Sequence, residues 1–159
     1  KEDTDKFLFK HLAGSLAFLP YGALVDHFQH WIYENPNTTP KERKLQWLEL
    51  ENIYQPGKNY DNLDFLKNGG LWQKQAHIYE MPFYYIDYTL AQVCAFQFWI
   101  RMQEDKESAW DDYLKLCKAG GSMSFLDLVK LANIKSPFDP KVFEEVATNI
   151  NNWLSEKSL

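Results

Sequence analysis

The spacing of apolar residues predicts helices along the whole chain. Between residues 21 and 34, for example, apolar side chains recur at helical intervals, and nowhere do apolar and polar residues alternate over the length of a strand. Clusters of proline, glycine and asparagine separate these segments. The predicted helices cover residues 5–17, 21–34, 40–54, 63–67, 71–79, 82–103, 108–118, 125–132 and 141–156.

Short capping patterns place two of these helix starts. Thr39 and Glu42 have the spacing of a capping box, and Pro40 occupies the first helical position, where a missing N–H costs nothing. Ser124 is the expected cap of the segment 125–132, with Asp127 three residues later. No internal repeat or low-complexity stretch interrupts the pattern. The sequence therefore predicts an all-α, single multi-helix domain over residues 1–159.

Composition indicates which partners the chain is expected to lack and in which compartment it is expected to lie. With 159 residues the chain is long enough to bury a core, and a net charge of −5 leaves no basic footprint for nucleic acid. No apolar run of transmembrane length is evident and the start is polar, so we expect neither a membrane partner nor a signal peptide. Cys94 and Cys117 are expected to be free thiols buried on helices, as in a reducing, cytoplasmic compartment.

The segment 77–88, HIYEMPFYYIDY, concentrates groups that can do chemistry. A helix beginning at Pro82 would bring Tyr84, Tyr85 and Tyr88 to one face, since residues three or four apart are neighbours on a helix. His77 lies just before that helix, which is expected to be the longest of the chain. Neutral donors beside an imidazole suit a site for a polar group with developing negative charge. By itself, aromatic residues at helical spacing more often indicate packing.

A resemblance to a known family favours a catalytic role for this segment over simple packing. The stretches that carry it are HIYEMPFYYIDYTLAQ, LPYGALVDHFQHWIYENP, NGGLWQKQ and AGGSMSFLDLVKLANIKSPF. Together they resemble, in order and rough spacing, the C-terminal part of oligoendopeptidase F enzymes, zinc metallopeptidases related to thimet oligopeptidase. The resemblance implies that the chain is the C-terminal portion of a larger helical zinc-peptidase fold whose substrates are oligopeptides.

The same resemblance assigns roles to residues. His77, Tyr85 and Tyr88 match the family's histidine and its two tyrosines three apart, which donate hydrogen bonds to the oxyanion formed during peptide hydrolysis. The interval from His77 to Tyr85 is one residue shorter than in thimet-like members, so Tyr84 and Tyr79 are alternates for the donor tyrosines. Both are also expected to bind substrate.

Gly120 and Gly121 have two readings. A glycine pair usually ends a helix with positive φ. The functional alternative is that Gly120, Gly121 and Ser122 form a flexible loop that borders a substrate cleft.

The chain lacks the family's metal-binding motif. The resembling enzymes carry HExxH, with two histidine ligands, a general-base glutamate and a later glutamate ligand. None of the histidines here is followed by glutamate: they are His11, His27, His30 and His77. His27 and His30 are three apart, but no third ligand accompanies them, so we interpret them as a structural pair. We predict no metal in this chain, and zinc only in the full-length enzyme.

The chain is therefore interpreted as a fragment that lacks the zinc-binding segment, is inactive alone and pairs with the missing N-terminal part. Its first residue, Lys1, agrees with that interpretation, because a complete translated chain normally starts with Met. The alternative is a stand-alone, non-catalytic helical module that binds peptides or acts as a scaffold.

Overall fold

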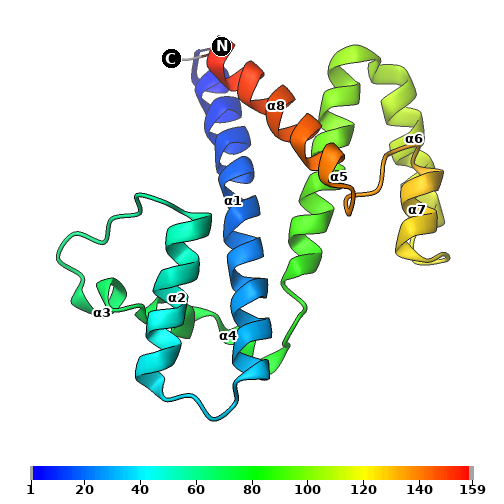
Figure 1. Ribbon diagram of the computed structural model, residues 1–159. Coiled ribbons are helices and arrows are strands. Elements are labelled where there is room, and N and C mark those ends of the chain that lie inside the picture. The colour runs from blue at the N-terminus through cyan, green and yellow to red at the C-terminus, as the bar shows by residue number, and fades with distance from the viewer. Residues whose placement is uncertain (1, 158–159) are drawn as a thin grey trace. The chain divides into compact units, whose positions relative to one another are not determined.

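Helices make up all the regular secondary structure of residues 2–157, the part of the chain that the computed structural model describes (Figure 1). No strand occurs within these residues, which confirms the predicted all-α class. The elements are α1 Glu2–Glu34, α2 Pro40–Tyr54, α3 Asp64–Lys67, the 3-10 helix η1 Gly70–Lys74, α4 Ala76–Glu80, α5 Ile86–Glu104, α6 Lys106–Ala119, α7 Phe125–Leu131 and α8 Pro140–Glu156.

Helix α1 is longer than predicted. The sequence suggested two helices separated near Pro20, but one helix of 33 residues runs through that position. A proline inside a helix costs about 3 kcal/mol. Buried apolar residues on both sides offset this cost, since each contributes about 1.5–3 kcal/mol. Those buried residues are Leu12, Leu19, Leu24, Val25 and Phe28.

Helix α5 begins four residues later than predicted, and the prediction that it is the longest helix was wrong. It has 19 residues and starts at Ile86, while Pro82 lies in a turn. The physical reason is at Phe83, whose φ of 64° lies in the left-handed region and cannot continue a right-handed helix. The backbone N–H of Phe83 donates to the side chain of Gln29 on α1 instead.

The capping predictions are confirmed. Thr39 and Glu42 form a full capping box at the start of α2: the Thr39 hydroxyl accepts from the Glu42 N–H at 3.3 Å, and the Glu42 carboxylate accepts from the Thr39 N–H at 2.7 Å. The Ser124 hydroxyl accepts from the Asp127 N–H at 3.3 Å at the start of α7. These contacts satisfy N–H groups that a helix start otherwise leaves unpaired.

Two compact units share the chain. One contains Ala17–Thr89, and the other contains Lys1–Leu16 with Leu90–Leu159. Each is described by itself below, and the single-domain organisation stays a prediction.

The unit Ala17–Thr89 has a core rich in tryptophan. Phe28 of α1 lies at its centre, with ring centroids 5.1 Å from Trp47 of α2 and 5.3 Å from Trp72 of η1. Ile78 of α4 belongs to the same cluster, so the C-terminal half of α1, α2, η1 and α4 pack around one centre (Figure 1). His77, beside Ile78, is thereby tied to this core.

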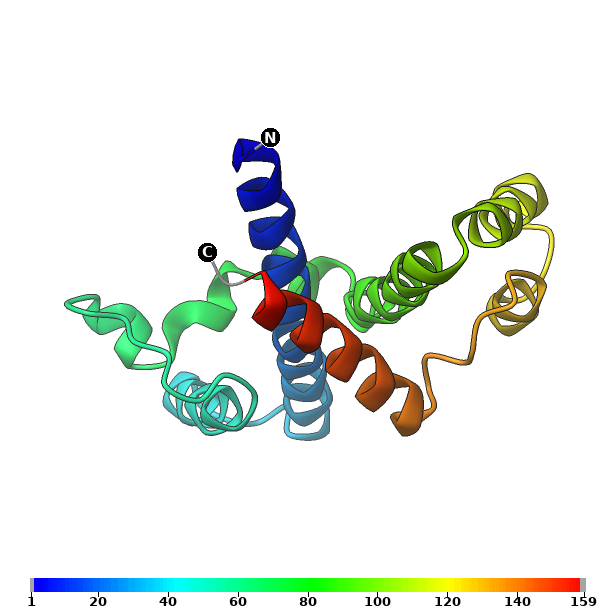
Figure 2. The ribbon, with the colours of Figure 1, turned by 90° about the horizontal axis from the view of Figure 1, so that it is seen from above.

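The other unit is built from α5, α6, α7 and α8, which are also seen in Figure 2. Phe98 of α5 packs with Val129 of α7 and with Ala132 and Ile134 behind it. On α8, Val142, Val146 and Ile150 recur every four residues and are buried, as an amphipathic helix requires. Trp153 of α8 meets the edge of Trp99 on α5 at 5.6 Å.

The apolar composition of α1 corrects one detail of the sequence analysis. Residues Asp3–Glu34 are long and apolar enough to cross a membrane by length and composition alone, which the sequence analysis did not recognise. A core helix of a water-soluble protein meets the same criterion. In α1, the apolar side chains of Leu24, Val25 and Phe28 are buried in the core of the unit Ala17–Thr89.

Candidate functional site

Three tyrosines and a histidine converge where α4 leads into α5. His77 lies on α4, Tyr84 and Tyr85 lie in the turn that follows, and Tyr88 lies in the first turn of α5. The rings of His77 and Tyr85 are stacked face to face, with centroids 4.2 Å apart and planes at 6°. Tyr88 is 5.7 Å from Tyr85 and 5.4 Å from Tyr84, ring centroid to ring centroid. We call these four residues the tyrosine cluster.

The local backbone explains why these side chains meet although the helix starts late. The carbonyl of Tyr84 accepts from the N–H of Asp87 at 3.2 Å, and the carbonyl of Tyr85 accepts from the N–H of Tyr88 at 3.2 Å. Both tyrosines therefore sit at the entry to α5 and supply the carbonyls of its first turn. Tyr84 and Tyr88 keep the four-residue neighbourhood that a helix would give them.

Helix α1 fixes the position of Tyr85. The ring of Tyr85 is half-buried and meets the rings of Phe18 at 5.8 Å and Tyr21 at 6.3 Å, both edge-on. Edge-to-face contacts of this kind are favourable for aromatic pairs. The hydroxyl of Tyr21 in turn accepts a hydrogen bond from the side-chain amide of Gln75, just before α4. Tyr85 is thus held on one side by α1 and on the other by His77.

The outer part of the cluster is open to solvent. Tyr84 is 42% exposed and Tyr88 is 50% exposed. Their hydroxyls are 3.3 Å apart, with Tyr88 donating to Tyr84. A ligand that approaches this surface would meet phenol groups directly.

Burial and hydrogen bonding shift the pKa values of three members of the cluster, Tyr84, Tyr85 and His77. Burial, with a smaller contribution from Tyr88, raises the pKa of Tyr85, and the hydrogen bond from Tyr88 raises the pKa of Tyr84. Burial also lowers the pKa of His77 below its ordinary value of 6.5. Nε2 of His77 is buried and has no hydrogen-bond partner within residues 2–157. The cluster therefore offers neutral phenols and a neutral imidazole with an unused nitrogen.

The remaining predicted site residues lie elsewhere in the fold. Tyr79 is exposed and stacks on Trp72 at 5.6 Å, so its ring is engaged with η1. Gly120 and Gly121 follow α6 and belong to the other unit, where a side chain at either position would meet open space. Gly120 ends α6 with a φ of 52°, which fits the helix-terminating reading of the glycine pair.

Two residues near the cluster, Gln29 and Phe83, were not predicted from the sequence to contribute to the site. Gln29 is fully buried on α1 and accepts from the Phe83 N–H at 2.9 Å. A signal for Gln29 was present: it is a polar residue next to the apolar positions of its helix, and buried polar groups need partners. The left-handed backbone of Phe83 had no such signal, because glycine and asparagine are the residues expected there.

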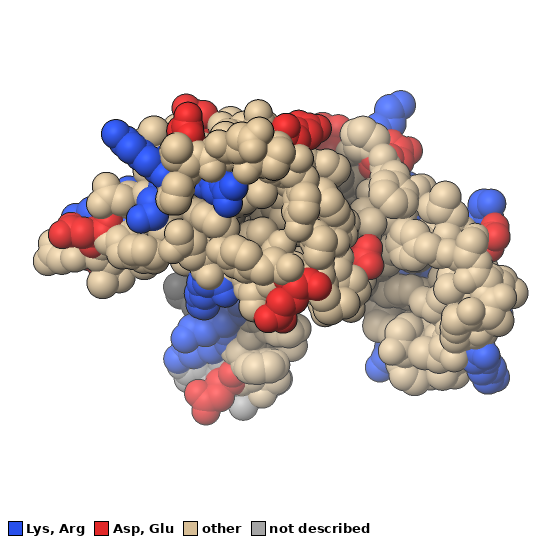
Figure 3. Space-filling model, turned by 90° about the horizontal axis from the view of Figure 1, so that it is seen from below, with Lys and Arg blue, Asp and Glu red and all other residues tan. Residues whose placement is uncertain are grey.

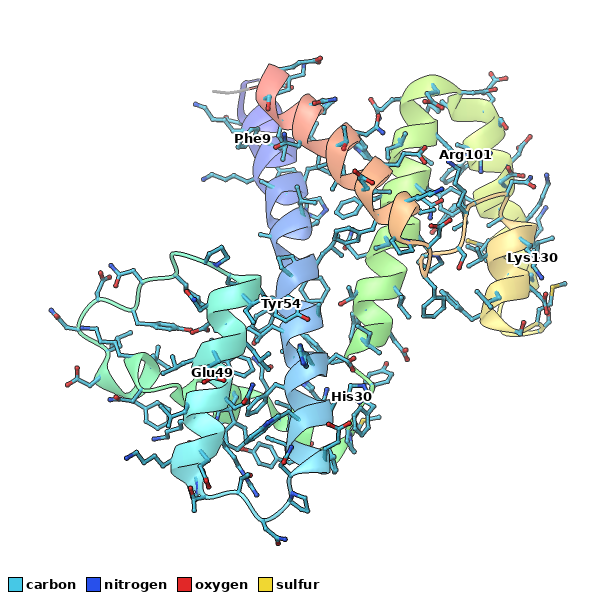
Figure 4. The ribbon with its side chains drawn as sticks, viewed as in Figure 1. Phe9, His30, Glu49, Tyr54, Arg101 and Lys130 are labelled. Carbon is cyan, nitrogen blue, oxygen red and sulfur yellow. The ribbon has the colours of Figure 1, made fainter. Side chains whose placement is uncertain are left out.

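His27 and His30 have separate structural partners, in line with their interpretation. Nδ1 of His27 is 3.1 Å from the hydroxyl of Tyr54, and Nε2 of His30 is 3.5 Å from the carboxylate of Asp26; Figure 4 labels His30 on α1 and Tyr54 on α2. Within residues 2–157 no three His, Cys, Asp or Glu side chains come together in a way that would hold a metal ion. The described residues therefore do not offer the ligand set of a zinc site.

On the surface seen in Figure 3, the charged side chains form no extended patch of one sign. Basic and acidic side chains occur there in small separate groups on a mostly uncharged surface. Nucleic-acid-binding surfaces usually show a continuous basic patch.

Comparison with known proteins decides the family. The model of peptidase family M3 matches residues 1–148. The chain belongs to peptidase family M3. Curated protein sequences gave no match.

Solved structures similar to this M3 chain include larger peptidases. A crystal structure described as an oligoendopeptidase F has 55% sequence identity and a TM-score of 0.93, and the match covers 99% of this chain and 28% of that chain. PZ peptidase A with an inhibitor has 54% identity and a TM-score of 0.93, covering 98% of this chain and 28% of that one. An oligoendopeptidase F structure from Bacillus anthracis has 44% identity and a TM-score of 0.79, covering 100% and 26%.

The M3 chain thus spans 28% or less of the length of these structures. The predicted relation to oligoendopeptidase F, and the prediction of an all-α portion of a larger fold, are confirmed.

Proposed function

We propose that this chain forms one wall of the active site of a zinc metalloendopeptidase that hydrolyses oligopeptides. In this proposal Tyr85, Tyr88 and His77 donate hydrogen bonds to the substrate's oxyanion, while Tyr84 contacts the bound peptide. The observation that carries the proposal is the stack of His77 on Tyr85, beside two exposed tyrosines, in a chain of a peptidase family. The similarity to a solved structure of PZ peptidase A with an inhibitor supports a peptidase function.

The chemistry of the cluster suits this role. Hydrolysis of a peptide bond passes through a tetrahedral intermediate whose oxygen becomes negatively charged, and fixed donors stabilise that charge. A phenol with a raised pKa stays protonated and can donate throughout the neutral range, and the pKa of Tyr85 is raised. Burial lowers the pKa of His77, and its buried Nε2 has no hydrogen-bond partner within the described residues.

The proposal assigns the zinc ligands to the rest of the enzyme. We expect the chain by itself to bind no stoichiometric zinc and to cleave no peptide, and elemental analysis of the purified chain tests this. One tightly held zinc ion per chain would contradict the assignment. A cytoplasmic location is also proposed, on the ground that Cys94 and Cys117 are both free thiols, although Cys117 is exposed rather than buried as predicted.

Phenylalanine substitutions in the full-length enzyme test the donors. Tyr85→Phe or Tyr88→Phe should lower kcat by about 10²–10³-fold and change KM little, because the hydrogen bond forms chiefly in the transition state. Tyr113→Phe is the matched control: it removes the same hydroxyl from a residue of α6 whose ring packs against Phe98, and kcat should stay near the parent value.

Full turnover in both Tyr85→Phe and Tyr88→Phe would refute the assignment of the donors. A full-length protein that binds peptides without cleaving them would instead favour the non-catalytic module.

A further inference from the structure

The turn between α4 and α5, which leads into the tyrosine cluster, contains one residue with an unfavourable backbone conformation. Phe83, one residue before Tyr84, has a φ of 64°, a region that residues other than glycine rarely adopt. Such a conformation persists only where surrounding contacts determine it, and it is often found at functional sites. The contacts that hold Phe83 therefore control where Tyr84 and Tyr85 lie.

Gln29 makes the polar contact to this turn. Its side-chain oxygen accepts from the backbone N–H of Phe83 at 2.9 Å, and the two residues are 54 positions apart in sequence. Gln29 is completely buried, and its side-chain nitrogen has no partner within the described residues. The Phe83 N–H fixes which end of the amide is the oxygen, since only the oxygen can accept a hydrogen bond.

Neighbouring residues of α1 hold the rest of the turn. The ring of Phe83 lies 4.9 Å from the ring of His30 and 5.1 Å from the ring of Tyr33, centroid to centroid. The Tyr33 hydroxyl also donates to the carbonyl of Ile78, at 3.3 Å. Ile78 follows His77 directly, so this one stretch of α1 contacts the backbone beside both stacked residues, His77 and Tyr85.

Filling space in the core does not by itself explain a glutamine at position 29. Burying an amide nitrogen without a partner is unfavourable, and an apolar side chain of similar length would fill the same space without that penalty. Methionine is such a side chain. What methionine cannot do is accept the hydrogen bond from Phe83.

We propose that Gln29 is a positioning residue for the reaction: its hydrogen bond to Phe83 sets the turn that stacks Tyr85 on His77. The inference rests on the proposed function, in which Tyr85 is an oxyanion donor. Gln29 touches neither substrate nor reacting atoms and acts only through the turn.

Kinetics of Gln29→Met in the full-length enzyme, with a quenched fluorescent oligopeptide as substrate, test the inference. Displacing a donor by about 1 Å can cost about 10²-fold in rate, so kcat should fall by up to that factor while KM changes little. The denaturation midpoint should fall no more than it does in the Gln97→Met control described below. Gln29→Glu keeps an acceptor oxygen at the same length, and its kcat should lie much closer to that of the parent.

A matched control comes from the other unit. Gln97 of α5 is also buried, and its side chain accepts from the Lys135 N–H at 2.8 Å and donates to the Lys135 carbonyl at 3.0 Å. Gln97→Met therefore removes a comparable buried amide. It should lower stability and leave kcat near the parent value.

A double substitution separates positioning from general damage. In the Tyr85→Phe background, Gln29→Met should lower kcat little further, because the donor that it positions is already gone. Equal losses in both backgrounds, a Gln29→Met protein that does not fold, or full turnover in Gln29→Met would each overturn the inference. If Tyr85→Phe loses turnover while Gln29→Met keeps it, the proposed function stands and only the role of Gln29 fails.

Discussion

Replacing Gly22 by alanine should destabilise the protein, although alanine is normally the better helix residue. Gly22 lies in the buried part of α1, and a Cβ at this position would stand 2.0 Å from Oγ1 of Thr89, far inside van der Waals contact. Thr89 is itself buried, and its hydroxyl has no hydrogen-bond partner within the described residues. Threonine has two accessible χ1 rotamers on a helix, but its side chain is buried here, so moving the hydroxyl away from the new carbon would disturb the surrounding packing.

The expected magnitude is a balance of two effects. Alanine in place of glycine inside a helix gains about 0.5–1 kcal/mol. Forcing an extra carbon into a packed contact costs about 1–3 kcal/mol. The free energy of unfolding should therefore fall by about 0.5–2 kcal/mol in Gly22→Ala.

The sign should reverse when Thr89 is also changed. In a Thr89→Ala background the clashing oxygen is gone, and the next atoms, Cβ of Thr89 at 3.4 Å and Cζ of Phe18 at 3.7 Å, are at ordinary contact distance. Gly22→Ala should then stabilise the protein by about 0.5–1 kcal/mol. Gly14→Ala is the matched control on the same helix, because a Cβ there meets nothing within 4 Å.

Urea denaturation followed by far-UV circular dichroism measures the parent and the four variants: Gly22→Ala, Thr89→Ala, the double variant and Gly14→Ala. The reasoning is refuted if Gly22→Ala and Gly14→Ala have the same effect, or if Thr89→Ala does not relieve the cost of Gly22→Ala.

Three further predictions concern packing, capping and pH. Phe28→Ala should lower the free energy of unfolding by about 3–5 kcal/mol in the same assay, because Phe28 is fully buried against Trp47. Thr39→Ala should cost about 1 kcal/mol and Thr39→Ser much less. The Thr39 hydrogen bonds lower the pKa of Glu42 below 4.5, so the difference between parent and Thr39→Ala should be largest above that pH and shrink as acid protonates Glu42. Burial lowers the pKa of His77 in the folded protein, so as the pH falls the unfolded state binds a proton at this histidine before the folded state does. The free energy of unfolding should therefore drop as the pH falls through about 6.5. In His77→Gln this drop should be smaller.

Local signals in the sequence were sufficient for the helix ends that lie at caps. The start of α2 was predicted from Thr39, Pro40 and Glu42, and the start of α7 from Ser124. Capping acts within one turn of helix, so the residues that determine it are adjacent in the sequence. The members of the tyrosine cluster were also found in the sequence, because they lie within twelve positions of one another.

Two helix boundaries could not be predicted locally. Pro20 reads as a helix end, yet α1 continues, because burial of Leu19, Leu24 and Val25 outweighs the lost hydrogen bond. Pro82 reads as a helix start, yet α5 begins at Ile86. In both places, contacts between distant parts of the chain overrule the local preference.

The sequence by itself determined the all-α class, the caps and the set of residues from which a site can be built. Only the tertiary structure decided how His77, Tyr85 and Tyr88 face one another. At Phe83 the left-handed turn is held by the hydrogen bond that its N–H donates to Gln29, 54 positions away, and the ring of Tyr85 is held by Phe18 and Tyr21 of α1. A backbone conformation that is unfavourable for its own residue can be maintained only by such distant partners, and no local pattern encodes them.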